Sequence, residues 1–188
     1  MDISSRGLPM NIFAVHRNPV IAARSLCDAH ISKMAHDVAH FLTSACALHN
    51  ITSLTYYERR DAQPNHPLSI WCGDNRKNYE WLCWHGLALG IEYKKRYNEK
   101  HSSIDAIKQA CSVIDQIPEG VQTPFVRAIN ENLYPQLNDR IEWPNTVLAY
   151  RAFYNLDKKN FAKWCGGRKP PAWWNPDFTL EVNTNENK

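Results

Sequence analysis

The stretch PVIAARSLCDAHISKMAHDVAHFLTSACAL, residues 19–48, decides the fold. Within it, apolar side chains recur at steps of three and four residues, which is the period of one face of an α-helix. These side chains are Ile31, Met34, Val38, Phe41, Leu42 and Ala45. The pattern predicts one long amphipathic helix from Pro19 to about Leu48, with its apolar face against a core.

A second long helix is expected from about Asp74 to Tyr97. One of its faces carries Tyr79, Leu82, Leu89 and Tyr93, and the other carries Trp84, Leu87, Ala88 and Ile91. A helix that is apolar on two sides is usually central in a bundle. We therefore expect this helix to be covered on both faces.

Shorter helices complete the expected bundle. The segment Ser102-Ser-Ile-Asp105 resembles a capping box and predicts the start of a third helix. Residues 124–132 are expected to form a short helix. Pro144 suits a first helical position and predicts a last helix from Asn145 to about Asp157.

The remaining segments frame a single all-α domain over residues 10–178. Residues 1–9 are expected to be a loose leader, and Asn11–Val15 a brief strand or extended arm. Glycine and proline rule out a long helix in the aromatic and basic C-terminal tail. Residues 179–188 are expected to fray. The predicted architecture is one compact helical bundle.

Composition excludes several classes of protein. A chain of 188 residues, 44% of them apolar, can build a core without disulfides or a structural metal. No apolar run approaches the roughly 18 residues of a membrane span, and the polar segment Met1–Pro9 is not a signal peptide. The six cysteines lie far apart without a C-x-x-C pair, so we expect reduced thiols and a cytoplasmic protein. The formal charge of +3 excludes an obligate nucleic-acid coat protein.

A polar stripe borders the apolar face of the first predicted helix. His30, Lys33, Asp37 and His40 follow one another at steps of three, four and three residues and share an arc of roughly 80°. A partly desolvated carboxylate in such a stripe can act as a base or stabilise a developing cation. The alternative is a solvated face with ordinary pairing of Lys33 and Asp37.

A second stripe lies on the helix predicted over 74–97. Asn78, His85, Glu92 and Arg96 share one arc beside its apolar face. If both helices pack through their apolar faces, the two stripes border one cleft.

His36 and His40 also have the i, i+4 spacing of a zinc-binding pair, as in the H-E-x-x-H motif, with Asp37 in place of the glutamate. Catalytic zinc needs a third ligand, for which His30, His66 and Glu92 are candidates. A metal-dependent hydrolase is therefore an alternative function.

Basic and aromatic residues meet in the tail and in one loop. Arg168 and Lys169 precede the pair Trp173-Trp174, and Tyr57 lies beside arginines in the loop before His66. Such patches bind nucleic acids through phosphate contacts and base stacking. Alternatively, the two tryptophans pin the tail onto the bundle, and His66 is a turn residue.

Several of these motifs are similar to those of the phage pyrimidine-dimer DNA glycosylases of the endonuclease V type. Asp28-x-His30 resembles the start of the family's first long helix, with a carboxylate seven positions after the histidine, here Asp37. His66, the segment Ile91–Arg96 and the tail from Arg168 to Trp174 resemble the family's His-bearing loop, long helix and C-terminus. The motifs NIF, D-x-H-x-x-K-M and N-Y-x-W-L also resemble those of small uncharacterised phage proteins.

The resemblance implies a DNA base N-glycosylase that acts on damaged or modified pyrimidines and needs no cofactor or metal. Asp37 would be the catalytic carboxylate, with His30, Lys33 and His40 beside it. Contacts to DNA would come from the basic and aromatic residues His66, Arg96, Arg168, Lys169, Trp173, Trp174 and Tyr57. We would expect DNA as the partner, no membrane association, and the host cytoplasm as the location of a phage-encoded chain.

Two departures from that family concern the nucleophile. The family uses an α-amino group at the start of the chain, whereas here a leader precedes Asn11. His36 and His40 stand where the family has arginines. The abasic-site lyase step is therefore either lost or carried by another amine such as Lys33. A non-catalytic phage protein that binds a host protein or nucleotide is the leading alternative.

Overall fold

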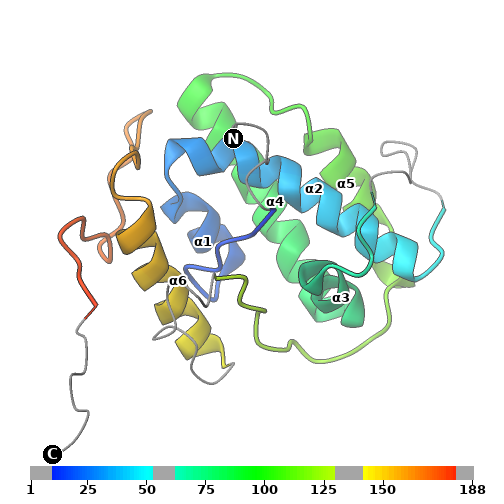
Figure 1. The fold of residues 1–188 in the computed structure, drawn as a ribbon. Helices are drawn as coiled ribbons and strands as arrows, with labels where there is room; N and C mark the ends of the chain where they lie inside the picture. The colour runs from blue at the N-terminus through cyan, green and yellow to red at the C-terminus, as the bar shows by residue number, and fades with distance from the viewer. Residues whose placement is uncertain (1–9, 53–61, 130–141, 181–188) are drawn as a thin grey trace, which may run out of the picture.

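Six α-helices and one 3-10 turn form the regular structure of the computed structural model, which describes residues 10–52, 62–129 and 142–180. They are α1 (Pro19–Ser25), α2 (Asp28–Leu48), α3 (Pro67–Asp74), α4 (Arg76–Tyr97), α5 (Ile104–Ser112), η2 (Ile114–Gln116) and α6 (Trp143–Asp157) (Figure 1). No strand occurs in these ranges. The predicted all-α fold is confirmed, while the predicted leader and most of the frayed tail lie outside the described residues.

The prediction of one helix from Pro19 to Leu48 is wrong in one respect, because this segment forms two helices, α1 and α2. Leu26 and Cys27 are extended and fully buried. The Cys27 amide donates to the Tyr154 hydroxyl at 2.9 Å instead of to a helical carbonyl, while the Leu26 carbonyl accepts from Arg96 at 2.9 Å. These tertiary bonds replace the helical ladder at the break. The long apolar stripe therefore divides into α1 and α2.

Helix α4 is the central element, as its double apolar pattern predicts, and it packs against α1, α2, α3 and α5. It begins at Asn75, whose side chain accepts from the Asn78 amide, and ends at left-handed Asn98. Gly86 and Gly90 bring its neighbours close. A Cβ atom on Gly90 would lie 2.0 Å from Ile104 of α5, and one on Gly86 would lie 2.6 Å from Val38 of α2. The two glycines therefore set the spacing of α2, α4 and α5.

Two predicted local features are wrong. The third helix begins at Ile104 as predicted, but its N-cap is Ser103 and not the Ser102 of the predicted capping box. The Ser103 side chain makes no capping bond, and the ring of His101 accepts the Ser103 amide at 3.1 Å. Residues 124–129 are not helical, and the remainder of the predicted 124–132 helix lies outside the described residues. Phe125 is fully buried there against Trp71, Trp81 and Trp143. Its tertiary packing outweighs the local helical preference.

The arm Asn11–Val15 is extended and buried beside α2 and α6, as one of the two predicted alternatives has it. The Phe13 ring contacts those of His30, Phe153 and Tyr154. The arm thus places the backbone of Asn11 next to α2.

The chain after α6 runs back along the bundle, drawn in orange to red in Figure 1. Asn155 of α6 binds this segment: its side chain donates to the Trp173 carbonyl at 3.3 Å and accepts from the Asn175 amide at 3.0 Å. The Trp164 indole donates to the Ser25 carbonyl at 3.2 Å. The aromatic tail is therefore docked on the bundle through residue 175.

Two further sequence expectations concern membranes and thiols. Among the helices that the structure describes, none combines the length and apolarity needed to cross a membrane. All six cysteines carry free thiols, four of them buried, as expected for core residues.

Candidate functional site

A carboxylate–ammonium pair lies on α2 at the predicted stripe. Asp37 is 2% exposed, and the Lys33 ammonium one turn earlier donates to its Oδ2 atom at 2.5 Å. The backbone amide of Asn11, supplied by the extended arm, donates to the same oxygen at 3.3 Å. Lys33 keeps 26% of its side chain exposed. The arrangement is a buried carboxylate whose charged partner Lys33 reaches the surface.

Two histidines lie on the same side of the molecule as Asp37. His66 forms the N-cap of α3, where its Nδ1 atom accepts the Leu68 amide at 3.1 Å, and its ring packs on Phe41. Burial lowers the pKa of His66, the nearby His40 lowers it further, and the charge of Asp37 raises it. The loop before α3 therefore brings His66 within electrostatic range of α2, a proximity that only the tertiary fold creates.

His30 is placed differently from the rest of the stripe. Its Nδ1 atom hydrogen-bonds the Tyr154 hydroxyl at 2.6 Å, and its ring contacts Phe13 and Phe161. Burial lowers the pKa of His30 to about 3, and the positive charge of Lys158 contributes in the same direction. His30 is therefore neutral near pH 7 and contacts the arm, α6 and the tail.

Lys158 is an unpredicted neighbour of this cluster. Its ammonium lies over the rings of Phe13, Phe153 and Phe161 at 4.9–5.9 Å from their centroids and pairs with Asp157. Cation–π contacts of this kind hold a charge in a partly desolvated place. The sequence contained no signal for it, since its three rings come from the arm, α6 and the tail.

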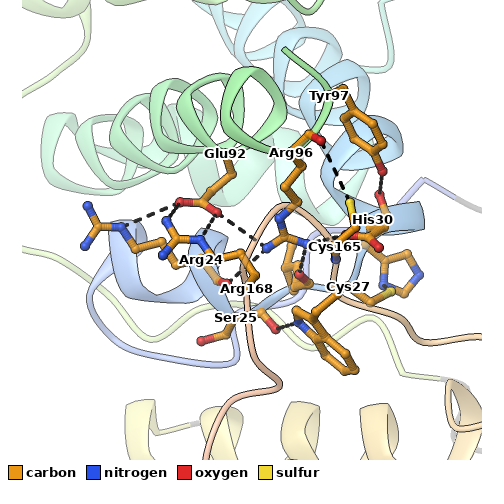
Figure 2. A network of polar contacts seen from close by, with 12 residues as sticks. Arg24, Ser25, Cys27, His30, Glu92, Arg96, Tyr97, Cys165 and Arg168 are labelled. Carbon is orange, nitrogen blue, oxygen red and sulfur yellow. Dashed lines mark hydrogen bonds and ion pairs between the residues drawn. The ribbon is translucent and has the colours of Figure 1, made fainter. Parts of the chain in front are cut away.

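The second predicted stripe does not face a cleft. Glu92 is 1% exposed and accepts two hydrogen bonds from Arg168 of the tail, one of them at 2.7 Å (Figure 2). The guanidinium groups of Arg96 and Arg24 lie 3.5 and 3.8 Å from the same carboxylate. One buried anion thus joins three arginines from α1, α4 and the tail.

Arg96 extends this ion network to α2. Its side chain is fully buried and donates to Asp28 at 2.9 Å as well as to the Leu26 carbonyl. Asp28 in turn accepts the Cys165 amide at 3.1 Å. Because the guanidinium of Arg96 is inaccessible, the predicted phosphate contact by Arg96 is wrong. Arg168, whose charge is paired with Glu92, is likewise a structural residue here.

Asn78 and His85 complete that stripe inside the core. Asn78 donates to the Trp71 carbonyl at 2.9 Å and accepts the Thr123 amide at 3.0 Å. His85 bonds the Pro19 carbonyl at 3.0 Å and stacks on Trp81. Both are fully buried, so the expected cleft shared by the two stripes is wrong. One apolar face of α4 and its polar arc are covered, whereas Trp84 and Ile91 on the other apolar face are exposed, so the predicted cover on both faces is wrong.

Acidification should destabilise the protein through His85. Burial lowers the pKa of His85 to about 4, whereas an unfolded histidine titrates near 6.5. Between these two pH values only the unfolded state binds the proton. The free energy of unfolding therefore decreases by up to about 1.4 kcal/mol for each unit by which the pH is lowered. His30 acts in the same direction. Urea unfolding of His85→Phe at several pH values should give a shallower pH dependence than wild type, and an unchanged slope would contradict this assignment.

The tryptophans of the tail pack against α6. Trp173 and Trp174 make edge contacts with Tyr154, and Trp174 also contacts Trp164. Both are only partly buried, so each retains some accessible surface. These contacts agree with the alternative prediction that the two tryptophans pin the tail onto the bundle. Lys169 is exposed, whereas Tyr57 lies outside the described residues.

The zinc prediction for His36 and His40 finds no geometric support. Within residues 10–52, 62–129 and 142–180, no three histidine, cysteine or acidic side chains are grouped so as to hold a metal ion.

No family model, curated protein or solved structure matches this chain. The similarity to the phage glycosylases therefore rests on the quoted motifs. The Lys33–Asp37 pair occurs, as the alternative to a catalytic stripe predicted, but Asp37 is buried and not on a solvated face.

Proposed function

We propose that this protein is a DNA base N-glycosylase that acts on a damaged or modified pyrimidine. The observation that supports this proposal is the buried Asp37 carboxylate with the Lys33 ammonium 2.5 Å away and the Asn11 amide at 3.3 Å. A desolvated anion next to an accessible amine suits a reaction in which positive charge develops on a sugar.

Asp37 would act on the deoxyribose as the glycosidic bond breaks. The electron pair of the C1′–N bond leaves with the base, and positive charge develops on C1′ and the ring oxygen. A fixed carboxylate stabilises that charge more strongly in a water-poor site than it would in water. The amide of Asn11 and the helix α2 hold the carboxylate in place before the substrate arrives.

Lys33 would supply the nucleophile. The Asp37 carboxylate takes a proton from the Lys33 ammonium, and the resulting amine attacks C1′ as the base departs with the bonding electrons. The departing base takes that same proton from Asp37, which is again a carboxylate as positive charge develops on the sugar. Opening of the sugar ring then leaves an imine between C1′ and Lys33 Nζ. Water hydrolyses this imine, or β-elimination breaks the 3′ phosphate ester and gives the lyase product.

The substrate base must leave the duplex before it reaches such a site. Lys169 is exposed and His66 is half-buried at the start of α3, so both remain candidates for DNA contact. Trp173 and Trp174 would use only the ring surface that their packing on Tyr154 leaves accessible. We assign no DNA contact to Arg96 or Arg168.

A base-release assay tests the function. The full chain is incubated with duplex and single-stranded DNA carrying a panel of oxidised, alkylated, dimerised and enzymatically modified pyrimidines, and free base is measured by mass spectrometry. We expect release of one class of base, and borohydride should trap a covalent DNA adduct that Lys33→Ala does not form. Release without trapping would assign attack to water instead of Lys33. Absence of release across the panel would overturn the glycosylase proposal in favour of a binding protein.

A further inference from the structure

An apolar groove lies on the side of α4 that faces α5. Its cavity volume is about 550 Å³. It is lined by Val20, Trp84, Leu87, Ala88, Gly90, Ile91, Lys94, Lys100, Ile104 and Lys108. None of these residues belongs to the Asp37 site, so the groove is independent of the proposed glycosylase chemistry.

The floor of the groove is a helical stripe. Trp84, Leu87, Ala88 and Ile91 stand at positions i, i+3, i+4 and i+7 of α4 and were expected to be a second buried face. Trp84 is instead 53% exposed and Ile91 is 66% exposed. Large apolar side chains gathered in one exposed hollow are typical of interaction sites.

The rim of the groove is positively charged. Lys94 lies in the last turn of α4, Lys100 lies in the loop that follows, and Lys108 lies on α5. Asp105 pairs with Lys100 at 2.5 Å, and the charge of Lys108 contributes to lowering the pKa of Asp105. Three lysines against this one acid leave a net positive rim, which favours an occupant with acidic flanks.

We propose that this groove binds an amphipathic α-helix with acidic flanks, presented by a partner protein. A stripe spaced i, i+3, i+4 and i+7 is about 10 Å long and matches the apolar ridge of a second helix. Ile91 is accessible to such a partner, since 66% of it is exposed. The partner helix covers Trp84 and Ile91 and places its carboxylates near Lys94 and Lys108.

Two fluorescent helical peptides of about 14 residues, roughly four turns, test the proposal. One carries leucines at i, i+3, i+4 and i+7 flanked by glutamates, and its twin carries lysines in place of the glutamates. Fluorescence anisotropy with the full chain should show saturable binding of the acidic peptide only. The variant Lys94→Glu/Lys108→Glu should weaken that binding about tenfold or more and bind the basic twin instead.

Matched variants distinguish binding in the groove from non-specific binding of the peptide. Ile91→Asp should weaken binding of the acidic peptide about tenfold. Leu148→Asp, which alters a similarly exposed residue of α6, should leave it unchanged, as should Lys159→Glu, a charge reversal outside the groove. Circular dichroism checks that each variant is folded.

Four outcomes would overturn the proposal. They are no binding of the acidic peptide at up to about 1 mM, equal binding of both peptides, binding that the groove variants leave unchanged, and a dimer of this chain that Ile91→Asp dissociates. The last outcome would show that the groove is an interface between two copies of this chain. None of them bears on base release, so this proposal and the glycosylase proposal fail separately.

Discussion

Asp37→Asn should lower the rate of base release by at least about 10²–10³-fold while DNA affinity stays within a few-fold of wild type. The asparagine amide has nearly the shape of the carboxylate but is neutral. It can neither stabilise the positively charged sugar nor accept the Lys33 proton. Lys33 is partly exposed, so water can solvate its ammonium and the fold should survive. Single-turnover base release and a DNA-binding titration measure the two quantities.

Asp105→Asn is the matched control for this prediction. Asp105 also pairs with a lysine at 2.5 Å, but both partners of that pair are exposed. Its loss should leave the rate of base release unchanged. Full activity of Asp37→Asn would remove Asp37 from the mechanism and with it the main support for a glycosylase.

Glu92→Ala should lower the free energy of unfolding by about 3–5 kcal/mol, the usual effect of removing one partner of a buried ion pair. The fully buried guanidinium of Arg96 would keep Asp28 alone as a charged partner, and Arg168 would lose both hydrogen bonds to the carboxylate. Urea unfolding at pH 7, followed by circular dichroism, measures the change.

The control for Glu92 lies on the same helix. Glu80 pairs with Lys77 at 2.9 Å, and both side chains are well exposed, so Glu80→Ala should cost no more than about 1 kcal/mol. If Glu92→Ala fails to fold, Glu92→Gln, which can still accept from Arg168, should fold with an intermediate loss. Equal small losses for Glu92→Ala and Glu80→Ala would show that the buried network adds little to stability.

Helical periodicity predicted the parts of the fold that one segment encodes by itself. The end of α2 at Leu48, the central place of α4 and the start of α6 near Pro144 follow from apolar spacing and end residues. The break at Leu26–Cys27 could not be predicted, because it depends on a hydroxyl from Tyr154 and a guanidinium from Arg96, far away in the sequence.

The candidate site divides in the same way. Lys33 and Asp37 are one turn apart on one helix, so their pairing could be predicted from sequence. The Asn11 amide could not, since it joins them only when the arm packs on α2. The i, i+4 spacing of Glu92 and Arg96 is the same whether the pair is solvated or buried. Their burial is decided by Asp28 and Arg168, each more than sixty positions away.

The ion network also constrains when the protein can finish folding during its synthesis. Its charges come from α1, α2, α4 and the tail, so contacts between distant parts of the sequence close it (Figure 2). Until Arg168 has left the ribosome, Glu92 lacks its bidentate partner, although the helix that carries it is already complete. Such late, non-local contacts slow folding. During synthesis, the carboxylate at the centre of the network therefore stays incompletely neutralised until the tail has emerged.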